Sequence, residues 1–322
     1  MNTPETVAIT GLRSFVGQRL AERLAERGGR MRVVGVDLRR PYRLEGRVRF
    51  HRVDLTEPSA AIRLAEIFEA ERVDTVVHAA FRRDPTPDLE YDHELQTIGT
   101  RHVAHACAAA KVKHLVMASS TMLYGARSDN PNFLTETHPL RGHPEAHCVM
   151  DRVAAEELLA QWQLVHSGTA VTVLRTCWIM GPTYWDFAVR HFAKPIVTAV
   201  LGYDPLFQFV HEEDCLRIFE SAVLAPRPGV FNIVGRGVLP LSTYLRSAGK
   251  QSLPVPAPVL FRVRSYPHQA QTGDRPEGFY DYLRYLWVAD GERGWNAFGE
   301  PHYTSREAWA AFISSRKLRR YR

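Results

Sequence analysis

Short apolar and β-branched runs alternate with helical patterns through the first half of the chain, and this alternation restricts the fold more than any other feature. The expected strands are Thr6–Thr10, Arg32–Asp37, Val48–Val53, Thr75–Ala79, His114–Ser119 and Ala170–Arg175. The expected helices are Phe15–Arg27, Ser59–Ala70, Tyr91–Ala110 and Cys148–Val165. Because parallel strands need crossover connections, such an alternation predicts an α/β protein with helices on both faces of a parallel sheet.

A glycine-rich turn lies between the first expected strand and the first expected helix. Gly11, Ser14 and Gly17 occupy a G-x-x-G-x-x-G pattern, with serine in place of the middle glycine. Gly11 permits a tight turn, and amides at a helix start attract a pyrophosphate. The side chain of Ser14 either crowds the phosphate or caps the helix and donates to the phosphate. The residues assigned to this phosphate site are Gly11, Arg13, Ser14, Phe15, Val16 and Gly17.

Asp37 ends the second expected strand, about 20 residues after the glycine-rich turn. A carboxylate at this place accepts hydrogen bonds from both hydroxyls of an adenosine ribose. Its charge disfavours a 2′-phosphate and so favours NAD, whereas Arg39 and Arg40 offset that charge and keep NADP as the alternative. Asp54 and Leu55 follow the third expected strand, and we place them at the adenine.

These signals predict a Rossmann-type doubly wound parallel sheet with a smaller C-terminal substrate-binding region. We expect residues 1–180 to form the dinucleotide-binding domain and residues 181–322 to be mainly substrate-binding. Two strand-like segments, Phe207–Asp214 and Gly229–Val234, indicate that part of residues 205–236 joins the dinucleotide-binding domain. The aromatic residues scattered through the second half are typical of a specificity region built on a rigid scaffold.

Charge and cysteine content narrow the expected partners and location. The net charge of +6 comes mainly from arginine, and no zinc-finger, RNA-binding sheet or basic-helix motif accompanies it, so nucleic acid is not an expected partner. The four cysteines are scattered, which predicts no metal site and a reducing, cytoplasmic setting. The sequence shows no signal-peptide pattern and no run near the roughly 18 apolar residues of a membrane span.

Further segments follow the glycine-rich turn in a characteristic order: Asp74–Ala80, Gly99–Thr100, Ser119–Gly125, Leu174–Pro182 and Phe209–Asp214. Across residues 5–240 this order resembles the extended short-chain dehydrogenase/reductase superfamily, specifically its NAD-dependent epimerase/dehydratase group. The resemblance implies that Ser119–Gly125 is the catalytic-serine segment. It also implies a homodimer formed through a pair of helices.

The resemblance assigns roles to single residues and also exposes departures from the family pattern. Ser120 takes the position of the catalytic serine. Cys148 and Arg152 stand where the family carries its active-site tyrosine and lysine. Gln96 and Trp178 each replace an asparagine of the family. The residues at and after the end of the fourth expected strand join the cofactor site: Ala79, Ala80 and Phe81. Four departures around one site indicate altered acid/base chemistry.

In the family mechanism the tyrosine exchanges a proton with the substrate oxygen, while the lysine lowers the pKa of the tyrosine. Ser120 still polarises a carbonyl here, and Arg152 keeps a positive charge but does not exchange protons near neutrality. The thiol of a cysteine has a pKa ordinarily near 8.5, and the adjacent cation would let Cys148 act as a proton shuttle or a nucleophile. The alternative is that Cys148 is simply a small buried residue. Tyr124 is a further candidate for the proton donor.

Neighbouring loops offer other proton donors, which are Tyr184, His143 and His147, and each has packing or surface exposure as its alternative role. The residues assigned to the substrate pocket are Trp178, Tyr184 and Trp185. Such an aromatic-lined pocket suits a ring-bearing or acyl-bearing small molecule.

The leading hypothesis is an NAD(P)-dependent oxidoreductase, or an epimerase/dehydratase-like enzyme, that acts on a hydroxyl or ketone of a small molecule with non-standard acid/base residues. One alternative is a dinucleotide-binding protein without redox turnover, because the tyrosine and lysine are missing. Another alternative is a non-redox isomerase, lyase or cyclase on the same fold.

Overall fold

The alternating runs form a parallel sheet in the computed structural model, which describes residues 4–27, 31–82, 84, 86, 88–263 and 278–319. The sheet has seven strands in the order β11-β6-β5-β4-β1-β2-β3, and every neighbouring pair is parallel. The strands are β1 (Thr6–Thr10), β2 (Arg32–Asp37), β3 (Arg49–Arg52), β4 (Thr75–His78), β5 (His114–Ser120), β6 (Ala170–Thr176) and β11 (Gly229–Ile233). This is the expected Rossmann-type sheet, in which the order of successive strands reverses between β1 and β4.

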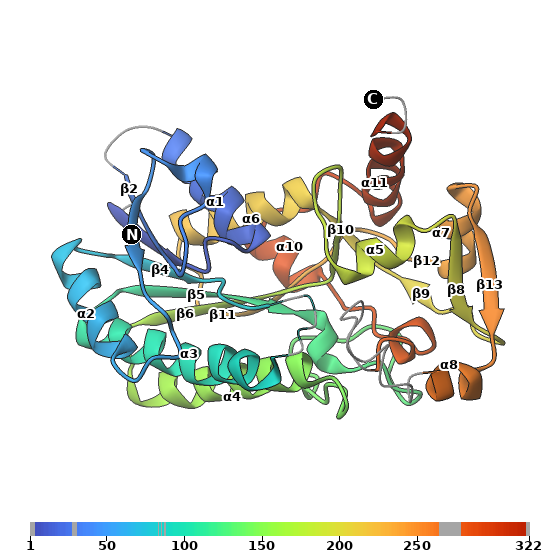
Figure 1. Cartoon of the computed structure of the whole chain (residues 1–322), viewed down its shortest axis with the longest axis horizontal. Helices are drawn as coiled ribbons and strands as arrows, with labels where there is room; N and C mark the ends of the chain where they lie inside the picture. Colours follow the sequence, from blue (N-terminus) through green and yellow to red (C-terminus); the bar gives the residue numbers. More distant parts are fainter. Residues whose placement is uncertain are drawn as a thin grey trace.

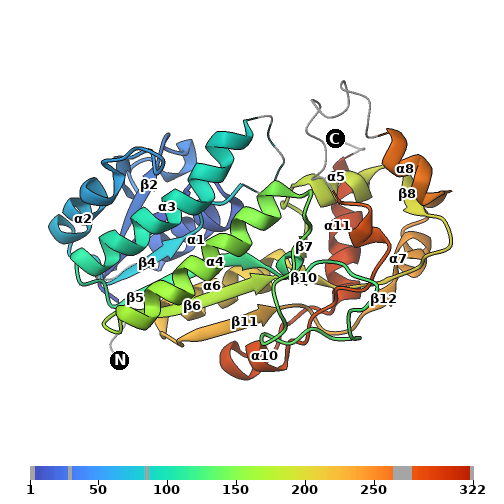
Figure 2. The same ribbon diagram turned by 90° about the horizontal axis from the view of Figure 1, so that it is seen from below.

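Helices cover both faces of the sheet (Figures 1 and 2). On one face lie α1 (Phe15–Glu26), α6 (Glu212–Leu224) and α10 (Glu292–Phe298); on the other lie α2 (Ala60–Ala70), α3 (Leu89–Ala109) and α4 (His147–Val165). Because side chains alternate along a strand, Val7 and Ile9 of β1 enter the core beneath α1, whereas Ala8 enters the core beneath α2 and α3. The sheet therefore has a buried core on each face, as a doubly wound fold requires.

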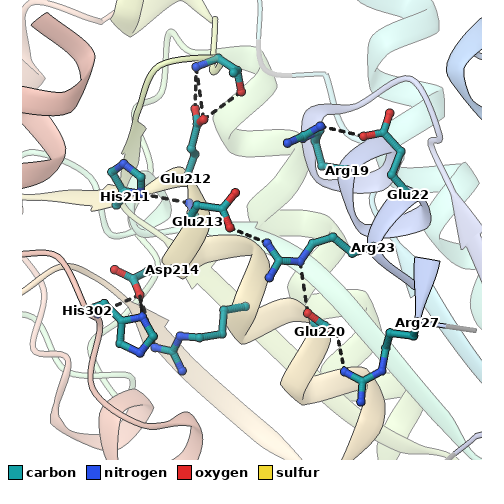
Figure 3. Close-up of polar contacts among 12 residues, drawn as sticks. Arg19, Glu22, Arg23, Arg27, His211, Glu212, Glu213, Asp214, Glu220 and His302 are labelled. Atoms are coloured by element: carbon teal, nitrogen blue, oxygen red, sulfur yellow. Dashed lines mark hydrogen bonds and ion pairs between the residues drawn. The ribbon is translucent and has the colours of Figure 1, made fainter. Parts of the chain in front are cut away.

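The two helices α1 and α6 are joined by ion pairs (Figure 3). Arg23 of α1 contacts Glu213 at 2.6 Å and Glu220 at 3.2 Å, and Arg27 contacts Glu220 at 2.7 Å. Because the glycine-rich turn leads directly into α1, these pairs connect the helix that follows this turn to α6.

The remaining elements lie mostly beyond the carboxyl ends of the sheet strands, on the right in Figure 1. Three two-stranded sheets are formed by β7 (Trp178–Met180) with β10 (Phe209–His211), β9 (Leu206–Phe207) with β12 (Leu239–Pro240), and β8 (Ile196–Val200) with β13 (Gln251–Val255). The helices of this part are α5 (Phe187–Ala193), α7 (Leu241–Ser247), α8 (Ala257–Val263) and α11 (Ser305–Arg319). Short 3₁₀ helices are η1 (Tyr42–Leu44), η2 (Thr121–Tyr124) and η3 (Asp281–Leu283).

One expected strand is only partly correct. Within Phe207–Asp214, Phe207 is the last residue of β9 and Phe209–His211 form β10, but α6 begins at Glu212. His211 caps the helix by accepting a hydrogen bond from the amide of Glu213, and three acidic residues occupy the first turn, where the helix dipole favours negative charge. In the part of the chain that the structure describes, no helix combines the length and the apolar character that crossing a bilayer requires.

Candidate active site

A cavity of about 590 Å³ opens at the carboxyl ends of the central strands, beside the switch point between β1 and β4. Ligands of doubly wound sheets bind at this place. The cavity is lined by Gly11, Arg13, Ser14, Phe15, Val16, Val36, Asp37, Leu38, Val53, Leu55, Ala79, Ala80, Phe81, Arg82, Asp84, Thr86, Tyr91, Leu95, Ala118, Arg152, Tyr184, Trp185 and Asp186. We call it the outer cavity.

The glycine-rich turn brings the backbone of β1 against the end of β4. Gly11 has φ of 75°, and a Cβ there would lie 2.5 Å from the Cα of Ala80. A Cβ at Gly17 would collide with the carbonyl oxygen of Gly11. Both positions therefore require glycine for close packing. The hydroxyl of Ser14 caps α1 by accepting from the amide of Gly17 at 3.0 Å, and it donates to the Gly11 carbonyl at 2.8 Å.

Asp37 lies on the outer cavity, where its carboxylate accepts hydrogen bonds from the backbone amides of Arg13 at 3.0 Å and Leu38 at 2.7 Å. It is therefore held against the glycine-rich turn. Arg39 and Arg40, both within the described residues, are not among those that line the cavity. Arg40 instead stacks on Phe50, 5.3 Å from the ring centroid. Asp37 therefore lies on the outer cavity, whereas neither Arg39 nor Arg40 lines it.

Two of the twelve residues assigned to the cofactor lie behind the cavity rather than on it. Gly17 supports the glycine-rich turn. Asp54 lies behind Tyr91, and its carboxylate accepts a hydrogen bond from the hydroxyl of Tyr91 at 3.3 Å. Burial and the charge of Asp54 raise the pKa of Tyr91 to about 12, so this phenol stays protonated. Tyr91 itself lines the cavity.

A smaller pocket of about 30 Å³ adjoins the outer cavity, and we call it the inner pocket. It is lined by Arg82, Ser120, Met122, Leu123, Cys148, Val149, Arg152, Trp178, Asp186 and Phe187. Arg82, Arg152 and Asp186 line both spaces, so the two adjoin at these residues. The structure thus brings together Ser120 of β5, Cys148 and Arg152 of α4, and Trp178 of β7, which come from three separate elements of the sequence.

The two consecutive serines of β5 have different surroundings. Ser120 lies on the inner pocket, and its hydroxyl accepts from the amide of Met122 at 3.2 Å. The hydroxyl of Ser119 is buried and donates to Glu156 of α4. Because side chains alternate along a strand, Ser120 lines the inner pocket and Ser119 does not.

Cys148 is a partly buried thiol at the inner pocket. Burial raises its pKa to about 11, against the opposing effect of the Arg152 charge. Desolvation therefore outweighs the adjacent cation, and the thiol stays protonated near neutrality. The guanidinium of Arg152 donates to the carbonyl of Arg82 at 2.8 Å and lies 4.9 Å from the centroid of the Phe81 ring. Arg152 is thereby held at the junction of the two spaces.

Three of the candidate proton donors lie away from both spaces. The hydroxyl of Tyr124 donates to Asn232 at 2.7 Å and accepts from Arg175 at 2.9 Å, and the residue is fully buried. Its pKa is raised to about 12 by burial. His143 pairs with Asp281 at 2.9 Å. His147 is exposed at the start of α4.

The segment after β7 carries the aromatic candidates into the outer cavity. Tyr184 is buried, with its ring edge-on to Phe15 at 4.8 Å, and Trp185 is half exposed beneath Arg316 of α11, 4.2 Å from the ring centroid. Asp186, which the sequence reasoning missed, ends the segment. Its signal was available, because an aspartate immediately before an apolar helix is a preferred cap.

Glu212 anchors this segment to the start of α6 (Figure 3). Its carboxylate accepts from the amide of Thr183 at 3.0 Å, the hydroxyl of Thr183 at 2.9 Å and the amide of Tyr184 at 2.7 Å. A Cβ at Gly181 would collide with this carboxylate. Gly181 thus allows the approach that fixes Tyr184 and Asp186.

Comparison with known proteins places this geometry in a family. The model of the NAD dependent epimerase/dehydratase family matches residues 7–233. An uncharacterized protein of Mycobacterium tuberculosis is 30% identical over 326 residues, which cover 98% of this chain and 85% of that protein.

Two solved structures share the fold over nearly their whole length. The UDP-glucose 4-epimerase of Thermus thermophilus in complex with NAD has a TM-score of 0.73 at 20% identity, covering 97% of this chain and 99% of that one. The UDP-glucuronic acid 4-epimerase of Bacillus cereus in complex with NAD has a TM-score of 0.70 at 17% identity, again covering 97% and 99%.

Proposed function

The chain belongs to the NAD dependent epimerase/dehydratase family, and from this premise we propose that it binds NAD and transfers hydride between that cofactor and a hydroxyl or ketone of a small molecule. The observation that carries the proposal is the outer cavity, lined by the glycine-rich turn and the Asp37 carboxylate, together with the adjoining inner pocket, which is lined by Ser120 at the end of β5. The residues of the outer cavity fit a dinucleotide. Gly11 packs on Ala80 with no room for a Cβ, and α1 begins at the cavity, where the amides of a helix start attract a pyrophosphate.

We assign the pyrophosphate to the start of α1, the adenosine ribose to Asp37 and the adenine to the end lined by Leu55. Ala79, Ala80 and Phe81 form the wall that follows β4. When bound, NAD supplies the hydride acceptor. Arg152 is placed to bind the ribose next to the nicotinamide, in the role that a lysine has elsewhere in the family, and Ser120 is placed to polarise the reacting oxygen.

The sequence leaves the acid/base group open among several candidates, and we propose non-catalytic roles for two of them. A thiol with a pKa of about 11 is a poor proton acceptor near neutrality, so Cys148 is proposed as a pocket wall. Tyr124 is proposed as a structural residue, because both of its hydroxyl contacts are to buried side chains away from the pocket.

For the substrate we propose a nucleotide sugar that binds between two parts of the chain. One part is the dinucleotide-binding domain, formed by residues 1–180 with part of residues 205–236. The other is a substrate-binding region formed mainly by residues 181–322. Support comes from the full-length fold match to epimerases of UDP-glucose and UDP-glucuronic acid. Trp178, Tyr184 and Trp185 add the aromatic surface on which a base or sugar ring packs.

Calorimetry with NAD and NADH tests the cofactor, and incubation with UDP-glucose, UDP-glucuronic acid and a panel of ketones tests the chemistry. We expect NAD to bind and hydride transfer to appear as a change in NADH absorbance that Ser120→Ala abolishes. Failure to bind either form of the cofactor would refute the proposal. Binding without any hydride transfer would establish a dinucleotide-binding protein without turnover, and turnover that persists without added or bound cofactor would establish a non-redox isomerase or lyase.

A further inference from the structure

A buried carboxylate stands at the junction of the outer cavity and the inner pocket. Asp186 is 3% exposed and lines both spaces, together with Arg82 and Arg152. One of its oxygens accepts from the amide of Val189 at 2.9 Å and so caps α5; the other accepts from the hydroxyl of Tyr184 at 2.8 Å. A desolvated carboxylate beside a pocket that also holds Ser120 is placed for proton transfer.

The position of Asp186 is fixed rather than incidental. The preceding residues are held by three hydrogen bonds to Glu212, and the following residues are helical. Tyr184 is itself 1% exposed and packs edge-on against Phe15 of the glycine-rich turn. The carboxylate and phenol therefore form a pair that is oriented toward the cavity from one short segment.

We propose that Asp186, oriented by the hydroxyl of Tyr184, is the acid/base group that exchanges the proton of the reacting hydroxyl in this chain, in place of the missing tyrosine. This inference rests on the proposed NAD-dependent function. In the oxidation direction the C–H and O–H bonds of the substrate alcohol break and a C=O bond forms. The hydride carries two electrons to NAD, and the proton passes to the Asp186 carboxylate. Reduction returns both in the opposite sense.

Charged and titratable groups of neighbouring elements share the lining of the two spaces with Asp186. Arg82 and Asp84 lie on the segment after β4, Cys148 and Arg152 lie on α4, and Tyr184 lies on its own segment. From α5, Arg190 pairs with Asp84 at 2.8 Å and His191 bonds the carbonyl of Thr198 at 3.1 Å. Arg82 and Arg152 place positive charge at the same pocket, and the ionised carboxylate is the form that accepts a proton.

The first test is the pH dependence of alcohol oxidation by the NAD-loaded enzyme, with whichever of UDP-glucose and UDP-glucuronic acid turns over. Wild-type turnover is expected to fall on the acidic side, because protonated Asp186 accepts no proton. Asp186→Asn keeps the cap of α5, since asparagine is also a preferred cap, but it removes the base. We expect turnover to fall about 10²–10⁴-fold and the acidic limb to disappear.

Tyr184→Phe separates positioning from catalysis. Loss of its hydroxyl removes a hydrogen bond to the ionised carboxylate, so the acidic limb is expected to remain but to move to higher pH. The matched control is Asp204→Asn. That aspartate accepts from the amide and hydroxyl of Ser242 at 2.8 and 2.6 Å and lies outside both spaces, so the pH profile should stay unchanged.

A second readout does not depend on rate. Difference infrared spectra of the reduced minus the oxidised holoenzyme should show a protonated-carboxyl band in the wild type that Asp186→Asn lacks. Calorimetry and thermal unfolding of the same variant should show NAD binding and folding like the wild type. An acidic limb and a carboxyl band that both survive in Asp186→Asn would overturn the assignment while leaving the proposed function intact. A wild type that binds no NAD would instead remove the proposed function.

Discussion

The guanidinium of Arg175 and the carboxylate of Glu156 form a buried ion pair, with Nη2 and Oε2 2.7 Å apart. Ser119 donates to the same carboxylate, and the hydroxyl of Tyr124 accepts from the same guanidinium. The pair therefore fastens α4 and η2 to the end of β6. It also explains why Tyr124, a residue of the serine segment, is engaged in the fold rather than in the pocket.

Removal of one charge from this pair is expected to destabilise the fold. Glu156→Gln leaves the Arg175 charge buried without its counter-ion, and we expect a loss of about 3–5 kcal/mol in the free energy of unfolding. Urea denaturation measures it. The control is Glu26→Gln, which breaks a solvent-exposed pair with Arg47 and should cost less than about 1 kcal/mol. Equal losses in the two variants would contradict the buried-pair interpretation.

A buried histidine makes the fold acid-sensitive. His78 bonds the hydroxyls of Thr10 at 2.7 Å and Thr100 at 3.0 Å, and burial lowers its pKa to about 3, with the charge of Arg152 acting in the same direction. The folded protein keeps this imidazole neutral, whereas the unfolded chain binds a proton below a pH of about 6.5. Stability from this group is therefore full above that pH and falls as the pH drops toward 3.

We expect His78→Asn to flatten the dependence of unfolding free energy on pH by up to about 1.4 kcal/mol per pH unit between pH 6 and pH 4, whatever its effect at pH 7. Denaturant titrations at several pH values measure the slope. His302→Asn, at a side chain that is 72% exposed, serves as the control. A wild-type slope retained in His78→Asn would show that other groups cause the acid sensitivity.

Much of this architecture was predictable from local pattern. The strand-helix alternation and the glycine-rich turn are properties of neighbouring residues, and they lead to the parallel sheet and to Gly11, Ser14 and Asp37 on one cavity. Burial was not predictable, because it depends on residues distant in the sequence. The sequence therefore left Cys148 open between a thiol activated by Arg152 and a small buried residue, and desolvation governs its pKa.

Asp186 was missed for a related reason. Its segment follows the family signature that ends in Gly181 and Pro182, and its sequence neighbours are aromatic, so the residues there predict packing. Only the folding of that segment onto the outer cavity brings the carboxylate beside Ser120 and Arg152.

Cofactor preference should depend on Asp37. We expect the wild type to bind NAD more tightly than NADP, because the carboxylate bonds ribose hydroxyls and repels a 2′-phosphate. Asp37→Ala should weaken NAD binding about 10- to 100-fold, which corresponds to the loss of one hydrogen bond to a charged group. The same variant should reduce the difference in affinity between NAD and NADP. Calorimetry with both cofactors measures it. The double variant Arg39→Ala/Arg40→Ala should leave NAD binding unchanged; tighter wild-type binding of NADP would show that these arginines reach the cavity.

The anchor between Gly181 and Glu212 should be sensitive to a single methyl group. Gly181→Ala places a Cβ where the Glu212 carboxylate lies, so either the carboxylate or the segment that carries Tyr184 and Asp186 must shift. We expect a loss of about 1–3 kcal/mol in unfolding free energy, together with a fall in hydride transfer. Gly168→Ala is the matched control, because no atom lies within 4 Å of a Cβ built there. If the collision is the cause, Gly181→Ala should cost less in a Glu212→Ala background than in the wild type, since the two changes share one contact. Additive losses in this double-mutant cycle would show that Gly181 acts through its backbone instead.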